Sequence, residues 1–125
     1  MLLSISVRDT ADISPQGINV YADDPIHALH NDTGAEVAAY WAPHTTHSDL
    51  TAFATPLQYA AWRYIPSTYV ICELDKCIAA HAQEDMVALT EGKVKAVRLR
   101  SGHMPMLSMP ERFAEVLKAE AGDMI

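Results

Sequence analysis

Asp75 and His103 are the two residues of this sequence whose types and positions best suit acid–base chemistry. Asp75 comes shortly after an apolar, β-branched run at 68–72, and His103 follows a second run at 94–99. Side chains just past the ends of parallel strands emerge at the same ligand-binding edge of a sheet. A carboxylate there can hold an imidazole in one tautomer and stabilise the imidazolium as it forms. An aspartate after a strand is also a common turn residue and helix cap, so neither residue is decisive alone.

Two pairs of histidines have the three-residue spacing that can place both imidazoles on one helical face: His27 with His30, and His44 with His47. No cysteine or carboxylate pattern nearby completes a zinc site, so we interpret them as polar residues. Cys72 and Cys77 lack the further cysteines that an iron–sulfur cluster requires. We therefore predict neither a metal nor a cofactor.

The elements that would position Asp75 and His103 are predicted most clearly in the second half of the chain. The run at 68–72 is apolar on both faces, as a buried parallel strand is. A helix is predicted over 78–90, with a buried stripe on one side, and Gly92 closes it. The run at 94–99 is a more polar strand, nearer an edge of the sheet. The predicted stripe consists of Ile78, Ala82, Met86 and Leu89.

A last helix is predicted to begin at Ser108, whose hydroxyl would cap it while Glu111 reaches back in a capping box. Pro110 fits its first turn, and Gly122 is a suitable C-terminal cap. Its buried face would comprise Phe113, Val116, Leu117 and Ala121. The order strand, helix, strand, helix predicts an α/β fold with a parallel sheet.

The first half, residues 1–55, has a different pattern, which we interpret as a lid or connector; residues 56–125 would form the core. A short strand is predicted at 18–21, and a helix from Thr33 that Pro43 ends. The face of that helix would carry Val37, Tyr40 and Trp41. A second short helix is predicted at 48–53, stopped by Thr55 and Pro56.

Length and charge limit the class of protein. The 125 residues suit one domain, and a net charge of −7 with scattered basic residues argues against a nucleic-acid partner. No apolar run approaches the length of a membrane helix, and the opening run at 1–5 is too short for a signal peptide. We expect buried, reduced cysteines, a reducing compartment and a cytoplasmic location.

Two stretches carry a family resemblance. Residues 61–75 read AWRYIPSTYVICELD, and residues 101–111 read SGHMPMLSMPE. The first resembles the penultimate strand of α/β-hydrolases of the methylesterase and hydroxynitrile-lyase type, and the second their catalytic-histidine loop and final helix. The similarity runs from about Pro56 to Ala121 and continues more weakly into the lid, through Asp24–Pro25, Asn31–Asp32 and Trp41. Related sequences are frequent in fungi, including tailoring enzymes of secondary metabolism.

The resemblance implies a doubly wound sheet with a helical lid segment, and it gives Asp75 and His103 the places of the triad acid and base. Glu73 is a fallback acid, two residues earlier. The order acid then histidine is the one expected for this fold. The implied activity is hydrolysis of a small ester, lactone or related carbonyl compound; lyase chemistry on the same residues stays open.

The nucleophile that the resemblance demands is missing from this sequence. No serine lies in a G-x-S-x-G elbow, and no glycine-rich oxyanion loop is present. Cys77 and Ser101 lie near the pair, but a buried cysteine and a turn serine are the more ordinary interpretations. We therefore expect a truncated chain that needs a complementing N-terminal half or a homodimer. The alternative is a non-catalytic remnant or partner-binding module.

Overall fold

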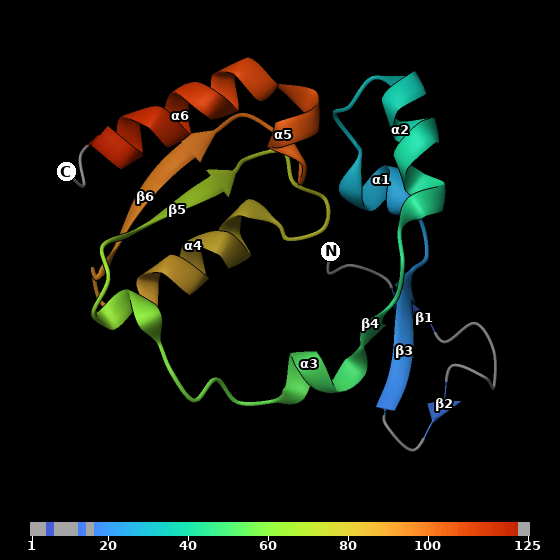
Figure 1. Cartoon of the computed structure of the whole chain (residues 1–125), viewed down its shortest axis with the longest axis horizontal. Helices are drawn as coiled ribbons and strands as arrows, with labels where there is room; N and C mark the ends of the chain where they lie inside the picture. The colour runs from blue at the N-terminus through green and yellow to red at the C-terminus, as the bar shows by residue number, and fades with distance from the viewer. Residues whose placement is uncertain (1–4, 7–12, 15–16, 123–125) are drawn as a thin grey trace.

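The computed structural model describes residues 5–6, 13–14 and 17–122. Of the opening run at 1–5, on which the absence of a signal peptide was argued, residues 1–4 lie outside the described residues. Two parallel strands, β5 (Ser67–Cys72) and β6 (Val94–Leu99), pair in register from Ser67 opposite Val94 to Cys72 opposite Leu99. Helix α4 (Ala80–Ala88) covers one face of this pair and α6 (Pro110–Gly122) the other (Figure 1). The predicted α/β arrangement is confirmed.

Burial along β5 is concentrated at the end that leads to the site. Ile71 and Cys72 are buried, whereas the earlier residues of the strand are only half-buried. Leu99, opposite Cys72, is buried as well. Among the described residues β5 pairs only with β6, so the prediction of a strand buried on both faces holds for its last two residues alone.

The buried side of α4 differs from the predicted stripe. Met86 and Leu89 are exposed, and the side chain that points inward is Gln83, which is 2% exposed. Periodicity predicted an apolar face, but the helix begins at Ala80 and turns its one long amide toward the end of β5. Glu91 and Gly92 take positive φ angles of 54° and 78° in the turn before β6.

The capping box at Ser108 is wrong. Ser108 ends a short helix, α5 (Pro105–Ser108), and its hydroxyl is buried without a hydrogen-bond partner in the described residues. Helix α6 begins at Pro110, as the tolerance of proline in a first turn allows. On its predicted buried face only Val116 is fully buried, and Leu117 is half exposed.

The first half centres on β3 (Gly17–Ala22), the predicted short strand. It pairs antiparallel with β1 (Ile5–Ser6), β2 (Ile13–Ser14) and β4 (Ser48–Asp49). Helix α3 (Leu50–Ala54) therefore starts later than predicted, because Ser48 and Asp49 pair with β3 and the Asp49 carboxylate accepts from the Thr51 amide. That hydrogen bond lowers the pKa of Asp49. A 3₁₀ turn, η3 (Ala61–Arg63), leads to β5.

The lid helices are α1 (Pro25–Leu29) and α2 (Ala35–Trp41), followed by the 3₁₀ turn η2 (Ala42–His44). The helix that Pro43 was predicted to end is thus confirmed. Its buried residue is Ala38, and the predicted face of Val37, Tyr40 and Trp41 is exposed. The two helices lie beside α5, near the end of β5 and β6 that carries the candidate residues (Figure 1). A division of the chain at residues 55 and 56 stays a prediction.

No helix in the described part of the chain is long and apolar enough to cross a membrane.

Candidate active site

Asp75 and His103 are in direct contact. The Nδ1 atom of His103 lies 2.9 Å from Oδ2 of Asp75, and the carboxylate is buried, at 8% exposure. The two loops that carry them are tied together, because the Leu74 amide donates to the Ser101 carbonyl at 2.9 Å. In this arrangement the Nδ1–H group donates a hydrogen bond to the carboxylate, and Nε2 is the ring nitrogen with a free lone pair. Among the described residues no hydrogen bond occupies Nε2.

The other carboxylate oxygen of Asp75 organises its own loop. Oδ1 accepts from the backbone amides of Cys77, at 2.7 Å, and Ile78, at 3.0 Å. These bonds form the aspartate turn that leads into α4. Oδ1 thus has the turn role, whereas Oδ2 contacts the His103 ring; the role of Asp75 as a triad acid stays a prediction.

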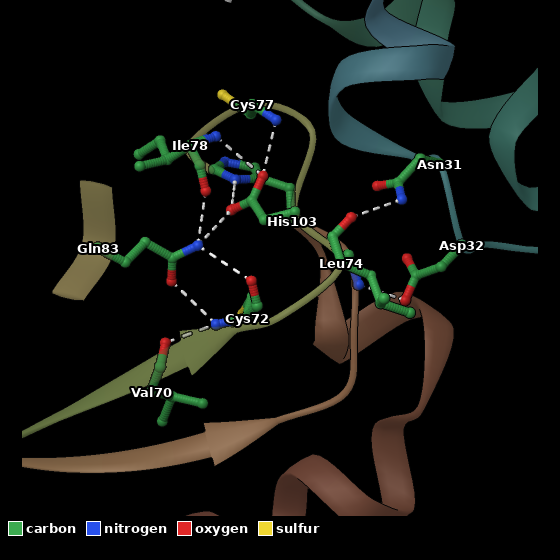
Figure 2. A network of polar contacts seen from close by, with 11 residues as sticks. Asn31, Asp32, Val70, Cys72, Leu74, Cys77, Ile78, Gln83 and His103 are labelled. Atoms are coloured by element: carbon green, nitrogen blue, oxygen red, sulfur yellow. Dashed lines mark hydrogen bonds and ion pairs between the residues drawn. The ribbon is translucent and has the colours of Figure 1, made fainter. Parts of the chain in front are cut away.

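Gln83 is the residue that the sequence reasoning missed. Its Oε1 accepts from the Cys72 amide at 2.9 Å, and its Nε2 lies within hydrogen-bond distance of three acceptors (Figure 2). These are the carbonyls of Ile78 (2.6 Å) and Cys72 (3.1 Å), and Oδ2 of Asp75 (3.3 Å). Two amide protons serve three acceptors, so the longest contact, to Asp75, is the weakest. The available signal was one glutamine on an otherwise apolar helix face.

Glu73, the fallback acid, points elsewhere. Its carboxylate pairs with the Arg98 guanidinium at 2.8 Å on the surface, and Arg98 also pairs with Glu84 at 2.6 Å. Strand alternation would place Glu73 and Asp75 on the same face, but β5 ends at Cys72 and the chain turns at 73–74, so the two carboxylates point to different partners. The structure thus brings Asp75, and not Glu73, to the histidine.

The alternative nucleophiles are not activated. Burial, and then the negative charge of Asp75, raises the pKa of the Cys77 thiol, so the group stays protonated near neutral pH. Burial also raises the pKa of the Cys72 thiol. Both cysteines are free thiols. Ser101 is fully buried in the turn before His103, which closes it to a substrate.

An open pocket of about 260 Å³ lies between the lid and the loop after His103. Met104, the next residue after His103, lines it together with Leu107 of α5 and Trp41 of α2. Leu29, His30, His44 and Thr45 complete the lining. The walls are mostly apolar, which suits a small ligand with an apolar part.

One member of the histidine pairs, His44, contacts the helix that precedes it. His44 has its Nδ1 2.6 Å from the Tyr40 carbonyl, and its ring packs 4.9 Å from that of Tyr40. In the part of the chain that the structure describes, no group of three histidine, cysteine or acidic side chains could hold a metal ion.

This arrangement, an acid after one parallel strand and a histidine after the next, with a lid over the same edge, has clear relatives. A model of the Alpha/beta hydrolase family matches residues 5–116. The chain belongs to the α/β-hydrolase family. It is 34% identical over 104 residues to the alpha/beta hydrolase nvfD of Aspergillus novofumigatus, and 32% identical over 99 residues to a probable hydrolase of a Phoma species. These matches cover 83% and 76% of this chain but 42% and 41% of the relatives. The chain thus spans about two fifths of their length.

Solved structures give the same fold. Polyneuridine aldehyde esterase superimposes on 86% of this chain with a TM-score of 0.70 at 19% identity, and the chain covers 46% of it. The pyrethroid hydrolase PytH superimposes on 94% with a TM-score of 0.68 at 21% identity, again with 46% of that protein covered. At these identities the likeness shows the fold alone.

Proposed function

We propose that this chain supplies the general base, the orienting acid and part of the lid of an esterase for a small ester, lactone or related carbonyl compound. The observation that carries the proposal is the 2.9 Å contact between His103 Nδ1 and buried Asp75, with Nε2 unoccupied among the described residues. Membership of the α/β-hydrolase family and the apolar pocket beside Met104 support it. A more specific version of this proposal is that the esterase acts on an intermediate of secondary metabolism.

In the proposed reaction a serine oxygen attacks the carbonyl carbon of the ester, and Nε2 of His103 takes the hydroxyl proton. Asp75 holds the ring in the Nδ1–H tautomer and stabilises the imidazolium. As the tetrahedral intermediate collapses, the C–O bond to the leaving alcohol breaks and His103 returns the proton to that oxygen. Water then repeats the sequence on the acyl-serine, releasing the carboxylic acid.

The serine belongs, in this proposal, to a complementing segment. The sequence contains no G-x-S-x-G elbow, so a second copy of the same chain would add no nucleophile. Among the described residues, the edge of β5 opposite β6 pairs with no strand, which suits the addition of further strands. Exposed apolar side chains flank β5 in the sequence: Tyr64, Ile65 and Leu74. Strand addition there would build the sheet outward from the site.

The test begins with the 5′ end of the native transcript, which defines the protein to express. Hydrolysis of p-nitrophenyl butyrate is then measured for the parent, His103→Ala, Asp75→Asn and the control His81→Ala, whose histidine is exposed on α4. We expect kcat to fall about 10³-fold or more in the first two and to stay unchanged in the control. Equal activity in all four proteins would refute the proposal. A message that starts at Met1 and encodes an inert chain would favour the non-catalytic role.

A further inference from the structure

Two adjacent lid residues, Asn31 and Asp32, contact the loops that carry the candidate acid and base. The Asn31 amide donates from Nδ2 to the Leu74 carbonyl at 2.9 Å, and the Gly102 amide donates to Oδ2 of Asp32 at 2.5 Å (Figure 2). Leu74 directly precedes Asp75, and Gly102 directly precedes His103. One dipeptide between α1 and α2 therefore links both catalytic loops to the lid.

The fit around Gly102 is close. A β-carbon at this position would overlap the side-chain oxygens of both Asn31 and Asp32, so only glycine leaves room for the contact. Gly102 is itself buried. The amide-to-carboxylate bond is charge-assisted, which makes it stronger than a bond between neutral groups.

The contact is costly for the lid itself. Oδ1 of Asn31 and Oδ1 of Asp32 are buried and have no hydrogen-bond partner in the described part of the chain. A buried acceptor without a donor is destabilising, because it has lost its hydrogen bonds to water without replacement. Helix α1 is already capped by another residue, because Asp24 accepts from the His27 amide at 2.9 Å. The helix that follows Asp32, α2, has Gly34 as its N-cap and no side-chain cap hydrogen bond, so the contact with Gly102, and not a capping role, explains the position of Asp32.

We propose that Asn31 and Asp32 are positioning residues that hold the Asp75–His103 hydrogen bond in place through Leu74 and Gly102. Asn31 fixes the backbone next to the acid, and Asp32 fixes the backbone next to the base. The backbone bond from Leu74 to Ser101 already joins the two loops, and the lid contacts add a fixed point next to the acid and another next to the base. The catalytic meaning rests on the proposed function, but the geometry can be tested without a substrate.

The test follows the His103 Nδ1 proton by ¹H–¹⁵N NMR on the 125-residue chain, with the signal assigned by its loss in His103→Gln. The parent should give one downfield proton that exchanges slowly with water. In Asp32→Ala and in Asn31→Leu we expect exchange at least about tenfold faster, or loss of the signal, because one loop is released. Asp32→Asn keeps an oxygen that can accept from Gly102, so its exchange rate should stay within about threefold of the parent.

The matched control is Asp24→Ala, which removes the cap of α1 in the same lid without touching either loop. It should lower the melting temperature as much as Asn31→Leu does, yet leave the signal unchanged. Asn31 is partly exposed and makes one neutral hydrogen bond, so Asn31→Leu should fold. Its exchange rate then tests the proposal even if Asp32→Ala does not fold. An unchanged exchange rate in folded Asn31→Leu, or equal acceleration in Asp24→Ala, would overturn the proposal. Esterase activity enters neither outcome, so the two proposals fail independently.

Discussion

The Asp75 carboxylate carries a charge that several buried groups experience. Its oxygens accept from two backbone amides, the Gln83 amide and the His103 ring. That charge, added to burial, raises the pKa of the Cys77 thiol. For Cys72, burial raises the pKa, the Ser101 hydroxyl opposes this, and Asp75 and Asp32 add to it. The same surroundings that orient a histidine keep both thiols neutral.

These shifts predict a pH dependence of stability. Both thiols have an ordinary pKa of 9.0 and a higher one in the folded chain, so the folded state holds their protons more tightly than the unfolded state. The free energy of unfolding should be level up to about pH 8.5 and fall above pH 9, as the unfolded thiols ionise first. Urea unfolding at a series of pH values measures this.

The double variant Cys72→Ala with Cys77→Ala is the control. Its unfolding free energy should fall less steeply above pH 9. The slope that remains would come in part from Tyr69, whose pKa burial also raises above 10.0. Identical slopes for the parent and the double variant would contradict the expectation.

At the scale of elements, the junction of β5, α4 and the acid loop depends on one buried amide. Gln83 bonds both the amide and the carbonyl of Cys72, and so takes the place of a neighbouring strand at the last residue of β5. It also reaches Asp75 and the Ile78 carbonyl. The side chain stops strand pairing where the acid loop begins.

Gln83→Leu should therefore lower the free energy of unfolding by about 2–4 kcal/mol. The substitution leaves the Cys72 amide and the carbonyls of Cys72 and Ile78 without the hydrogen bonds that Gln83 makes. Glu84→Gln, at the next position, is the control: its pair with Arg98 is half exposed and should cost less than about 1 kcal/mol. Urea unfolding compares the two. A loss in Gln83→Leu no greater than in Glu84→Gln would show that the network is not needed.

At the scale of the whole molecule, no strand in the described part of the chain pairs with the outer edge of β5. The Glu73 amide faces β6, because it donates to the Leu99 carbonyl, whereas the Cys72 amide faces Gln83. Backbone groups alternate along a strand, so those of Thr68 and Val70 face the same way as those of Cys72, away from β6. An unpaired edge flanked by exposed apolar side chains favours association.

Val70→Pro tests this edge. Proline there removes an amide that faces away from β6 and is tolerated on an edge, so the fold should persist. We expect the parent chain to self-associate with a Kd of roughly tens of micromolar, as a weak contact does. The Val70→Pro variant should self-associate at least about tenfold more weakly. Ile71→Pro is the control, since its amide lies on the β6 side and its loss should abolish cooperative unfolding. Equal sedimentation profiles for parent and Val70→Pro across a concentration series would contradict this.

Local patterns were enough for the strands and for their order. The run predicted at 68–72 is a strand that begins one residue earlier, the run at 94–99 is a strand as predicted, and the helix between them makes them parallel. Asp75 and His103 follow from the same patterns together with the family resemblance, because each comes just after a strand. These features depend on side-chain periodicity over a few residues, which a sequence displays directly.

The partners of the site residues were decided only by the tertiary structure. Periodicity marks an apolar stripe on α4, yet Gln83 is the buried residue, because its amide meets backbone groups at the end of β5. The contacts of Asn31 with Leu74 and of Asp32 with Gly102 join residues 43 and 70 positions apart. Such contacts form only when separate elements are packed together, and no local preference encodes the distance between them. The sequence by itself determined which residues reach the edge of the sheet, and the packing of lid, helix and strands determined what holds them there.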